Sequence, residues 1–116
     1  MKEIPDFRQD DPEFLDLRRE FVREALQRTT EMATILKRSD PGLPAEAPGT
    51  RFRKLAHDLR GAGGSYGFPI VTLFAGEAED TYLDQGHPEA LAAIVGMLDG
   101  AVRQAGGLVG IPDLRR

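Results

Sequence analysis

The chain has 116 residues, a net charge of −4 and no cysteine. This length predicts one domain spanning residues 1–116, and 41% hydrophobic with 29% charged residues indicates a folded rather than a disordered chain. The lack of cysteine excludes disulfides, zinc–thiolate sites and thiol catalysis, and the acidic balance argues against nucleic acid as a partner. The charged opening MKEIPDFRQDD does not resemble a signal peptide, and no apolar run reaches membrane-spanning length. We therefore expect a cytoplasmic protein without membrane contact.

The first predicted helix starts at Asp11-Pro12, an N-cap residue followed by a proline at the first helical position. It ends before the turn signal of residues 39–42, Ser-Asp-Pro-Gly. Apolar residues recur along it at helical spacing: Phe14, Leu17, Phe21, Val22, Ala25, Leu26, Met32, Ala33 and Leu36. Residues 1–10 are expected to form a short capping helix across one end of the fold.

A loop that contains Pro44 and Pro48 separates this helix from the second, which is predicted to begin near Gly49-Thr50, with Thr50 as its cap. The apolar stripe of the second helix comprises Phe52, Leu55, Ala56, Leu59 and Ala62.

The third predicted helix begins after Gly67, has Pro69 in its first turn and fades around residues 84–86. Its expected stripe is Ile70, Leu73, Phe74 and Ala78. The fourth begins at Pro88, ends at Gly106-Gly107 before a loosely packed tail, and carries Leu91, Ile94, Val95, Leu98, Ala101 and Val102. Four amphipathic helices with mostly short connections predict an all-α fold, an antiparallel up-and-down four-helix bundle.

The stretch HDLRGAGGSYGF, residues 57–68, contains four glycines in seven residues and one of two histidines. One interpretation is a glycine-rich cradle for a nucleotide phosphate. Such a cradle needs a strand before the glycines and a helix after them. The preceding residues, RFRKLAHDLR, follow helical spacing instead, and no lysine followed by serine or threonine completes a phosphate-binding loop. The sequence therefore favours a helix.

On a helix, His57 lies away from the apolar stripe, on the exposed side of the second helix. Its neighbours on that side are Arg53, Lys54, Arg60, Gly61 and Gly64. Each glycine inside a helix costs about 1 kcal/mol of stability relative to alanine. Several glycines beside His57 therefore indicate a surface without side chains that allows another protein to approach closely. The spacing alone leaves a second interpretation open, in which His57 is an ordinary exposed histidine and the glycines only end the helix.

The segment AHDLRGAGGSYGFPIVTLFAGEAED, residues 56–80, resembles the signature of histidine-containing phosphotransfer (HPt) domains. That signature has a histidine, a basic residue and a glycine at fixed offsets, a glycine ten residues after the histidine, and spaced apolar residues that lead to an acidic residue. It matches this sequence at His57, Leu59, Arg60, Gly61, Gly67, Phe74, Ala75 and Glu79. Two positions depart from it. Arg60 replaces the usual lysine and keeps its charge, whereas Ala78 replaces a leucine and weakens a core position.

The resemblance implies that His57 accepts a phosphoryl group on Nε2 from a phospho-aspartate and passes it to an aspartate of another receiver domain. Imidazole suits this role because its reference pKa, about 6.5, leaves much of it neutral at pH 7. Arg60, one turn away, would stabilise the phosphate. Arg53, Lys54, Gly61 and Gly64 would form the receiver-docking face.

The implied partners are response-regulator receiver domains and a hybrid histidine kinase. The implied protein is a monomeric phosphoryl carrier that has no kinase activity, cofactor or metal of its own, while the receiver supplies Mg²⁺. We expect Gly63 and Gly67 to serve packing and helix termination, Glu79 to serve the structure of the third helix, and His87 to be structural. Two alternatives are a non-catalytic helical interaction module that docks through the glycine-rich face, and a dimeric phosphotransferase. The latter would need a long apolar seam for which 116 residues leave no spare helix.

Overall fold

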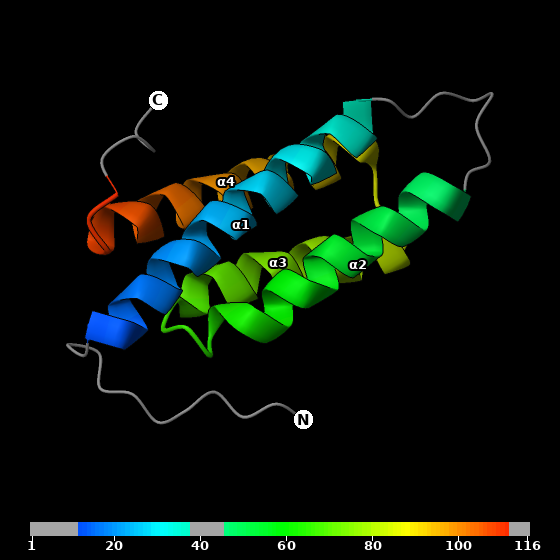
Figure 1. Cartoon of the computed structure of the whole chain (residues 1–116). Helices are drawn as coiled ribbons and strands as arrows, with labels where there is room; N and C mark the ends of the chain where they lie inside the picture. The colour runs from blue at the N-terminus through cyan, green and yellow to red at the C-terminus, as the bar shows by residue number, and fades with distance from the viewer. Residues whose placement is uncertain (1–11, 38–45, 112–116) are drawn as a thin grey trace.

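Four helices make up the computed structural model of this chain, which describes residues 12–37 and 46–111, with the backbone alone for residues 46–49. They are α1 (Pro12–Lys37), α2 (Glu46–Gly63), α3 (Pro69–Leu83) and α4 (Pro88–Leu108). Successive helices run in opposite directions along a common axis (Figure 1). The predicted all-α four-helix bundle is confirmed.

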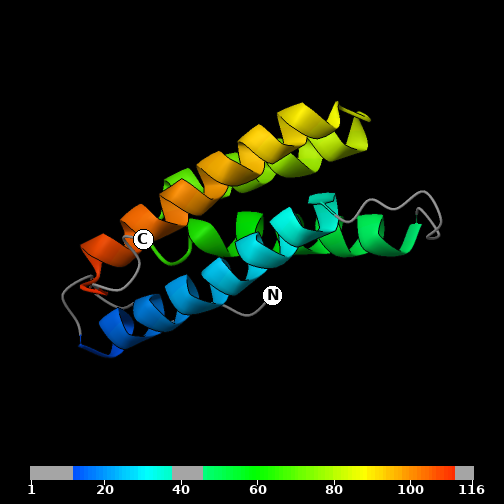
Figure 2. The same ribbon diagram turned by 90° about the horizontal axis from the view of Figure 1, so that it is seen from above.

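Each helix packs against two others, so the bundle closes on itself. α2 packs against α3, α3 against α4, α4 against α1, and α1 against α2. Figure 2 shows the α1–α2 pair beside the α3–α4 pair. This order places the α2–α3 surface and the α1–α4 surface on opposite sides of the bundle. None of the described helices is long and apolar enough to cross a membrane.

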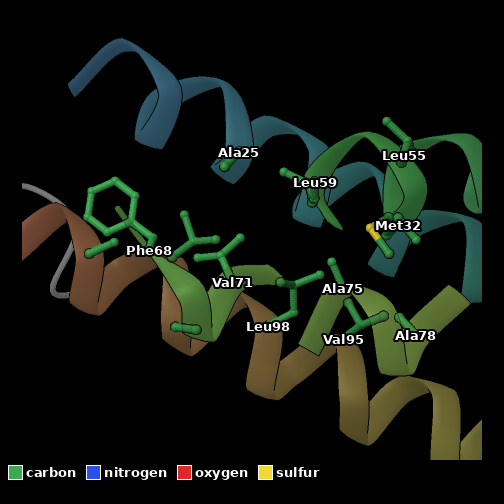
Figure 3. Close-up of a cluster of buried hydrophobic side chains, with 14 of the residues drawn as sticks. Ala25, Met32, Leu55, Leu59, Phe68, Val71, Ala75, Ala78, Val95 and Leu98 are labelled. Atoms are coloured by element: carbon green, nitrogen blue, oxygen red, sulfur yellow. The ribbon is translucent and has the colours of Figure 1, made fainter. Parts of the chain in front are cut away.

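The core lies between the four helices and contains large side chains from each of them (Figure 3). Fully buried members include Met32, Phe52, Leu55, Leu59 and Leu98. Burial of each such side chain favours folding by about 1.5–3 kcal/mol. The apolar spacing that predicted helices α1, α2 and α4 therefore also identified residues on their buried faces.

Two of the predicted helix boundaries are wrong. α2 begins at Glu46 rather than near Gly49-Thr50, so Thr50 lies within the helix and is not its cap. Pro48 falls in the first turn, where backbone N–H groups have no partner within the helix, and a proline is tolerated there. α4 continues through the expected Gly106-Gly107 stop to Leu108.

The residues that follow α4 are packed rather than loose, since Val109 and Ile111 are buried. This corrects the expectation of a loosely packed tail for residues 109–111. The expected capping helix of residues 1–10, the Asp11 cap and the last five residues lie outside the described residues.

The expected apolar stripe of α3 is also wrong in part. Ile70 and Leu73 are 50% and 53% exposed, whereas Val71 and Ala75 are buried with Ala78. The first turns of α3 are apolar on nearly every side. Periodicity therefore cannot decide between two apolar faces whose positions are shifted by one residue along the helix. Packing against α2 and α4 buries the face with the smaller side chains.

The connection between α2 and α3 is tight and depends on two glycines. A Cβ atom at Gly63 would lie 2.8 Å from the backbone nitrogen of Thr72 and 3.1 Å from the Phe68 oxygen, so only glycine allows this approach. Gly67 takes a φ of +86°, and the Phe68 N–H donates to the Gly63 carbonyl over 2.8 Å, which closes the helix end. The structural roles expected for Gly63 and Gly67 are confirmed.

Candidate functional site

His57 lies on the exposed side of α2, and its side chain is 71% accessible. Its Nδ1 atom is 3.1 Å from Oε2 of Glu79, a residue of α3 that is only 5% exposed. A carboxylate accepts hydrogen bonds but does not donate them, so Nδ1–H is the donor in this contact. In the neutral ring, Nε2 then carries the lone pair. The contact therefore holds the tautomer in which Nε2 is the nucleophilic atom.

Two arginines of α2 contact the same carboxylate. Nη1 of Arg60 lies 3.2 Å from Oε1 of Glu79 and 3.3 Å from Oδ1 of Asp80. Nε of Arg53 lies 4.0 Å from Oε2 of Glu79. A buried carboxylate is costly unless charged or hydrogen-bonding groups surround it. Arg53, His57 and Arg60 supply that surrounding, and they make the carboxylate a fixed acceptor for the imidazole.

The spacing of these three residues on α2 follows from helix geometry. Arg53 precedes His57 by four residues and Arg60 follows it by three, so all three lie on the same side of α2. Gly76 of α3 makes room for Arg60, because a Cβ atom there would lie 3.2 Å from its Nε. Sequence reasoning missed Gly76, since its role depends on which residues of α2 and α3 are opposite one another.

The neighbouring turn of α3 fixes this alignment. The Thr72 hydroxyl donates to the carbonyl of Arg60 over 2.9 Å and accepts from the N–H of Gly64 over 2.7 Å. These bonds join α3 to the last turn of α2. They hold Glu79 at a constant position opposite His57.

Lys54 is not brought into this cluster. At 100° per residue it lies on the other flank of His57, toward α1, where Arg51 is found. Arg51 hydrogen-bonds Glu31 of α1 and lowers the pKa of that carboxyl. Of the residues predicted to surround His57, Arg53 and Arg60 therefore meet Glu79, whereas Lys54 is exposed beside the α1 side.

The glycines next to His57 leave an open surface. Gly61 is exposed, and a Cβ atom there would have no neighbour within 4 Å. Gly64 is also exposed, with only the Thr72 hydroxyl in ordinary contact range at 3.6 Å. On α3, Leu73 follows Thr72, whose hydroxyl bonds α2, and its apolar side chain is 53% exposed. Periodicity had placed Leu73 in the core.

Glu79 is the second residue whose surroundings the sequence did not reveal. It was expected to serve only the structure of α3, yet it is the only buried charged side chain among those that the structure describes. A signal was present, because Glu79 follows the small core residue Ala75 by four positions and so lies on the inward side of α3. An acidic residue at an inward position requires a cationic or hydrogen-bonding partner.

His87 lies apart from this site, exposed at the start of α4 with an extended backbone conformation. Within the described ranges, no group of three histidine or acidic side chains is arranged to hold a metal ion.

Comparisons of the chain with protein-family models, with curated proteins and with solved structures give no significant match. The function proposed below therefore rests on the geometry around His57 and on the motif of residues 56–80.

Proposed function

We propose that this protein is a phosphorelay intermediate that accepts a phosphoryl group on His57 from one receiver-domain aspartate and passes it to another. The observation that carries the proposal is the contact between His57 Nδ1 and the buried Glu79, which leaves Nε2 exposed and nucleophilic. An exposed histidine without a role has no need of a buried carboxylate that is itself held by two arginines.

The proposed transfer is a single displacement at phosphorus. Nε2 of His57 forms a bond to phosphorus as the bond between phosphorus and the aspartyl oxygen breaks, and the receiver carboxylate is released. The imidazole gains positive charge because Nδ1 keeps its proton. Glu79 offsets that charge at 3.1 Å, and it acts as a positioning residue because it does not contact the phosphoryl group. The reverse reaction charges the next receiver.

Arg60 is proposed to stabilise the phosphoryl group. It lies one turn from His57 and is 46% exposed, and its guanidinium bonds Glu79 and Asp80 at the edge of the site. A guanidinium has five donors, so it can keep one carboxylate contact while it meets a phosphoryl oxygen. Arg53, which is farther from Glu79, is assigned to docking.

The receiver is proposed to dock over the open surface formed by Gly61, Gly64 and Leu73, with Arg53 and Lys54 attracting its acidic pocket. Phosphoryl transfer depends mainly on positioning and on charge stabilisation. The receiver would supply the aspartate and the Mg²⁺, and this chain the imidazole. Receiver domains and a hybrid histidine kinase in the cytoplasm are the proposed partners.

The direct test is incubation of the protein with the receiver domains of its source organism, each charged with acetyl phosphate. The expected product is phosphate on this chain that is labile to acid and stable to base, as a phosphohistidine is. If competent receivers bind the chain but transfer no phosphate, the protein is a helical interaction module instead.

Glu79→Gln should slow phosphotransfer by roughly ten- to a hundredfold, because a charge-assisted hydrogen bond is worth about 1.5–3 kcal/mol. Arg60 would hold the amide oxygen, which turns the amide NH₂ toward Nδ1 and favours the tautomer with a proton on Nε2. The measurement is the single-turnover rate at saturating receiver.

Asp80→Asn is the matched control, because Asp80 also bonds Arg60 but is 63% exposed and contacts Arg60 rather than His57. It should leave the rate near that of the unmodified protein. Equal effects of the two substitutions would show that Glu79 acts only through Arg60, and the tautomer argument would be wrong.

A further inference from the structure

Arg60 uses only one of its three guanidinium nitrogens to contact α3. Its Nη1 lies 3.2 Å from Oε1 of Glu79 and 3.3 Å from Oδ1 of Asp80. Nη1 carries two hydrogens, so it can donate one to each carboxylate. No described residue bonds Nε–H or Nη2, and the side chain is 46% exposed. The edge of the guanidinium that Nε and Nη2 form is therefore free to bind another group.

This free edge has the geometry that a phosphoryl group requires. Nε–H and one Nη2–H of an arginine point in parallel, and together they bind two oxygens of one phosphate side by side. Both carboxylates that contact Arg60 bind at Nη1, so they leave this pair of donors unoccupied. Lysine, the usual residue of the HPt signature at this position, is a point charge without such an edge.

Gly76, which is buried on α3, lies against the flat face of this guanidinium. A Cβ atom at Gly76 would be 3.2 Å from Nε of Arg60 and 3.5 Å from both Cδ and Cζ. These three distances place the Cβ directly above the guanidinium plane, because a Cβ in line with Nε–H would be farther from both carbons. The planar group therefore lies flat on the backbone of α3 at a position without a side chain.

Neither its own backbone conformation nor the backbone of α2 requires a glycine at position 76. Its φ is not among the positive values, which occur at Gly67 and Gly110. The three atoms nearest to an added Cβ all belong to the side chain of Arg60, whereas at Gly63 they include backbone atoms of α3 and the preceding turn. Glycine inside a helix is less stable than alanine. Its presence at position 76 is therefore explained by the side chain of Arg60.

We infer that Gly76 is a positioning residue for Arg60, and that the edge it keeps aligned binds two oxygens of the phosphoryl group on His57. This inference rests on the proposed function. The two carboxylates hold Nη1, and the glycine lets the guanidinium lie flat, so the direction of the Nε–Nη2 edge is set before the phosphoryl group arrives. A methyl group at position 76 would push the guanidinium away from α3 and turn that edge. Arginine at position 60 therefore depends on glycine at position 76, whereas a flexible lysine would not.

This dependence can be measured in a double-mutant cycle. Gly76→Ala should slow labelling of His57 by phosphoramidate and by saturating receiver about tenfold, since a misplacement of about 1 Å can cost about a hundredfold in rate. Its melting temperature should hold or rise, because alanine favours the helix. Arg60→Lys should also slow labelling, because an ammonium cannot bind two oxygens side by side. The double variant should be no slower than Arg60→Lys, since lysine presents no planar group to the added methyl.

Gly96→Ala is the matched control, because Gly96 is also a helical glycine but an added Cβ there would meet no atom within 4 Å. It should label at the rate of the unmodified protein. An unchanged rate in Gly76→Ala or in Arg60→Lys overturns the inference. Rate losses that multiply in the double variant also overturn it, because they would show that Gly76 acts independently of Arg60.

NMR of the arginine side chains in the unphosphorylated protein tests the positioning without the relay. The Nη1 hydrogens of Arg60 should give separate signals in the unmodified protein and in Gly96→Ala, because two carboxylates hold them. In Gly76→Ala these signals should average, as they do in a freely rotating guanidinium. Unchanged Arg60 signals in Gly76→Ala overturn the inference whether or not the relay operates. Averaged signals in a protein that no donor phosphorylates would support the positioning role and count against the proposed relay alone.

Discussion

His57→Gln is expected to abolish phosphate acceptance from charged receivers while the helical content and melting temperature stay unchanged. The side chain is 71% exposed and makes no part of the core, so its replacement removes the nucleophile without a cavity. Glutamine has no nitrogen that can form the phosphoramidate bond. The measurements are phosphate incorporation from charged receivers and far-UV circular dichroism.

His87→Gln is the matched control, because the chain has only two histidines and His87 lies exposed before α4. This variant should accept phosphate as the unmodified protein does. Labelling that survives His57→Gln and disappears with His87→Gln would assign the chemistry to His87 at the start of α4, and the proposed site would be wrong.

Gly61→Gln should separate receiver docking from stability. An added side chain at Gly61 meets no atom of the chain within 4 Å, and glutamine favours the helix by up to about 1 kcal/mol over glycine. Side chains on a helix lean toward its N-terminus, so the new group would project toward His57, four residues earlier. We expect an unchanged or higher melting temperature and a transfer rate from receivers that falls by at least about tenfold, since docking would lose well over 1.4 kcal/mol.

Phosphoramidate, a small donor that needs no docking surface, should still label Gly61→Gln. Gly63→Ala gives the opposite contrast, because its Cβ would meet backbone atoms of Phe68 and Thr72. Such overpacking costs about 1–3 kcal/mol, so this variant should melt earlier while its folded fraction still transfers phosphate. Normal receiver transfer by Gly61→Gln would show that the open surface beside His57 is not a docking face.

The bundle could be predicted from the sequence because three of its helices carry clear apolar stripes with turn signals between them. The buried face of α3 could not be predicted in this way. Its first turns contain Ile70, Val71 and Leu73 in succession, and periodicity favoured the wrong pair. The buried side of such a helix is decided by the helices beside it. The start of α2 differs from the predicted one for a local reason. A first helical turn accepts proline, so α2 includes Pro48 although proline is typical of a loop.

Only part of the candidate site could be predicted from the sequence. Helical spacing alone placed His57, Arg53, Arg60 and Gly61 on the exposed side of α2, because those residues belong to one helix. Helical spacing does not show which residues of two neighbouring helices contact each other. The position of Glu79 against His57 depends on the alignment of α2 with α3, which the close approach at Gly63 fixes. No pattern within either helix contains that alignment.

The central claim is that His57 carries a phosphoryl group on Nε2, and nitrogen-15 NMR of the imidazole rings tests it most directly. Before phosphorylation, the spectrum should show a proton on Nδ1 of His57, as the contact with Glu79 requires. After incubation with charged receivers, Nε2 of His57 should show coupling to phosphorus, and the ring of His87 should be unchanged. The absence of phosphorus coupling at His57, with receivers that lose their phosphate to a known acceptor in the same buffer, would contradict the proposed function.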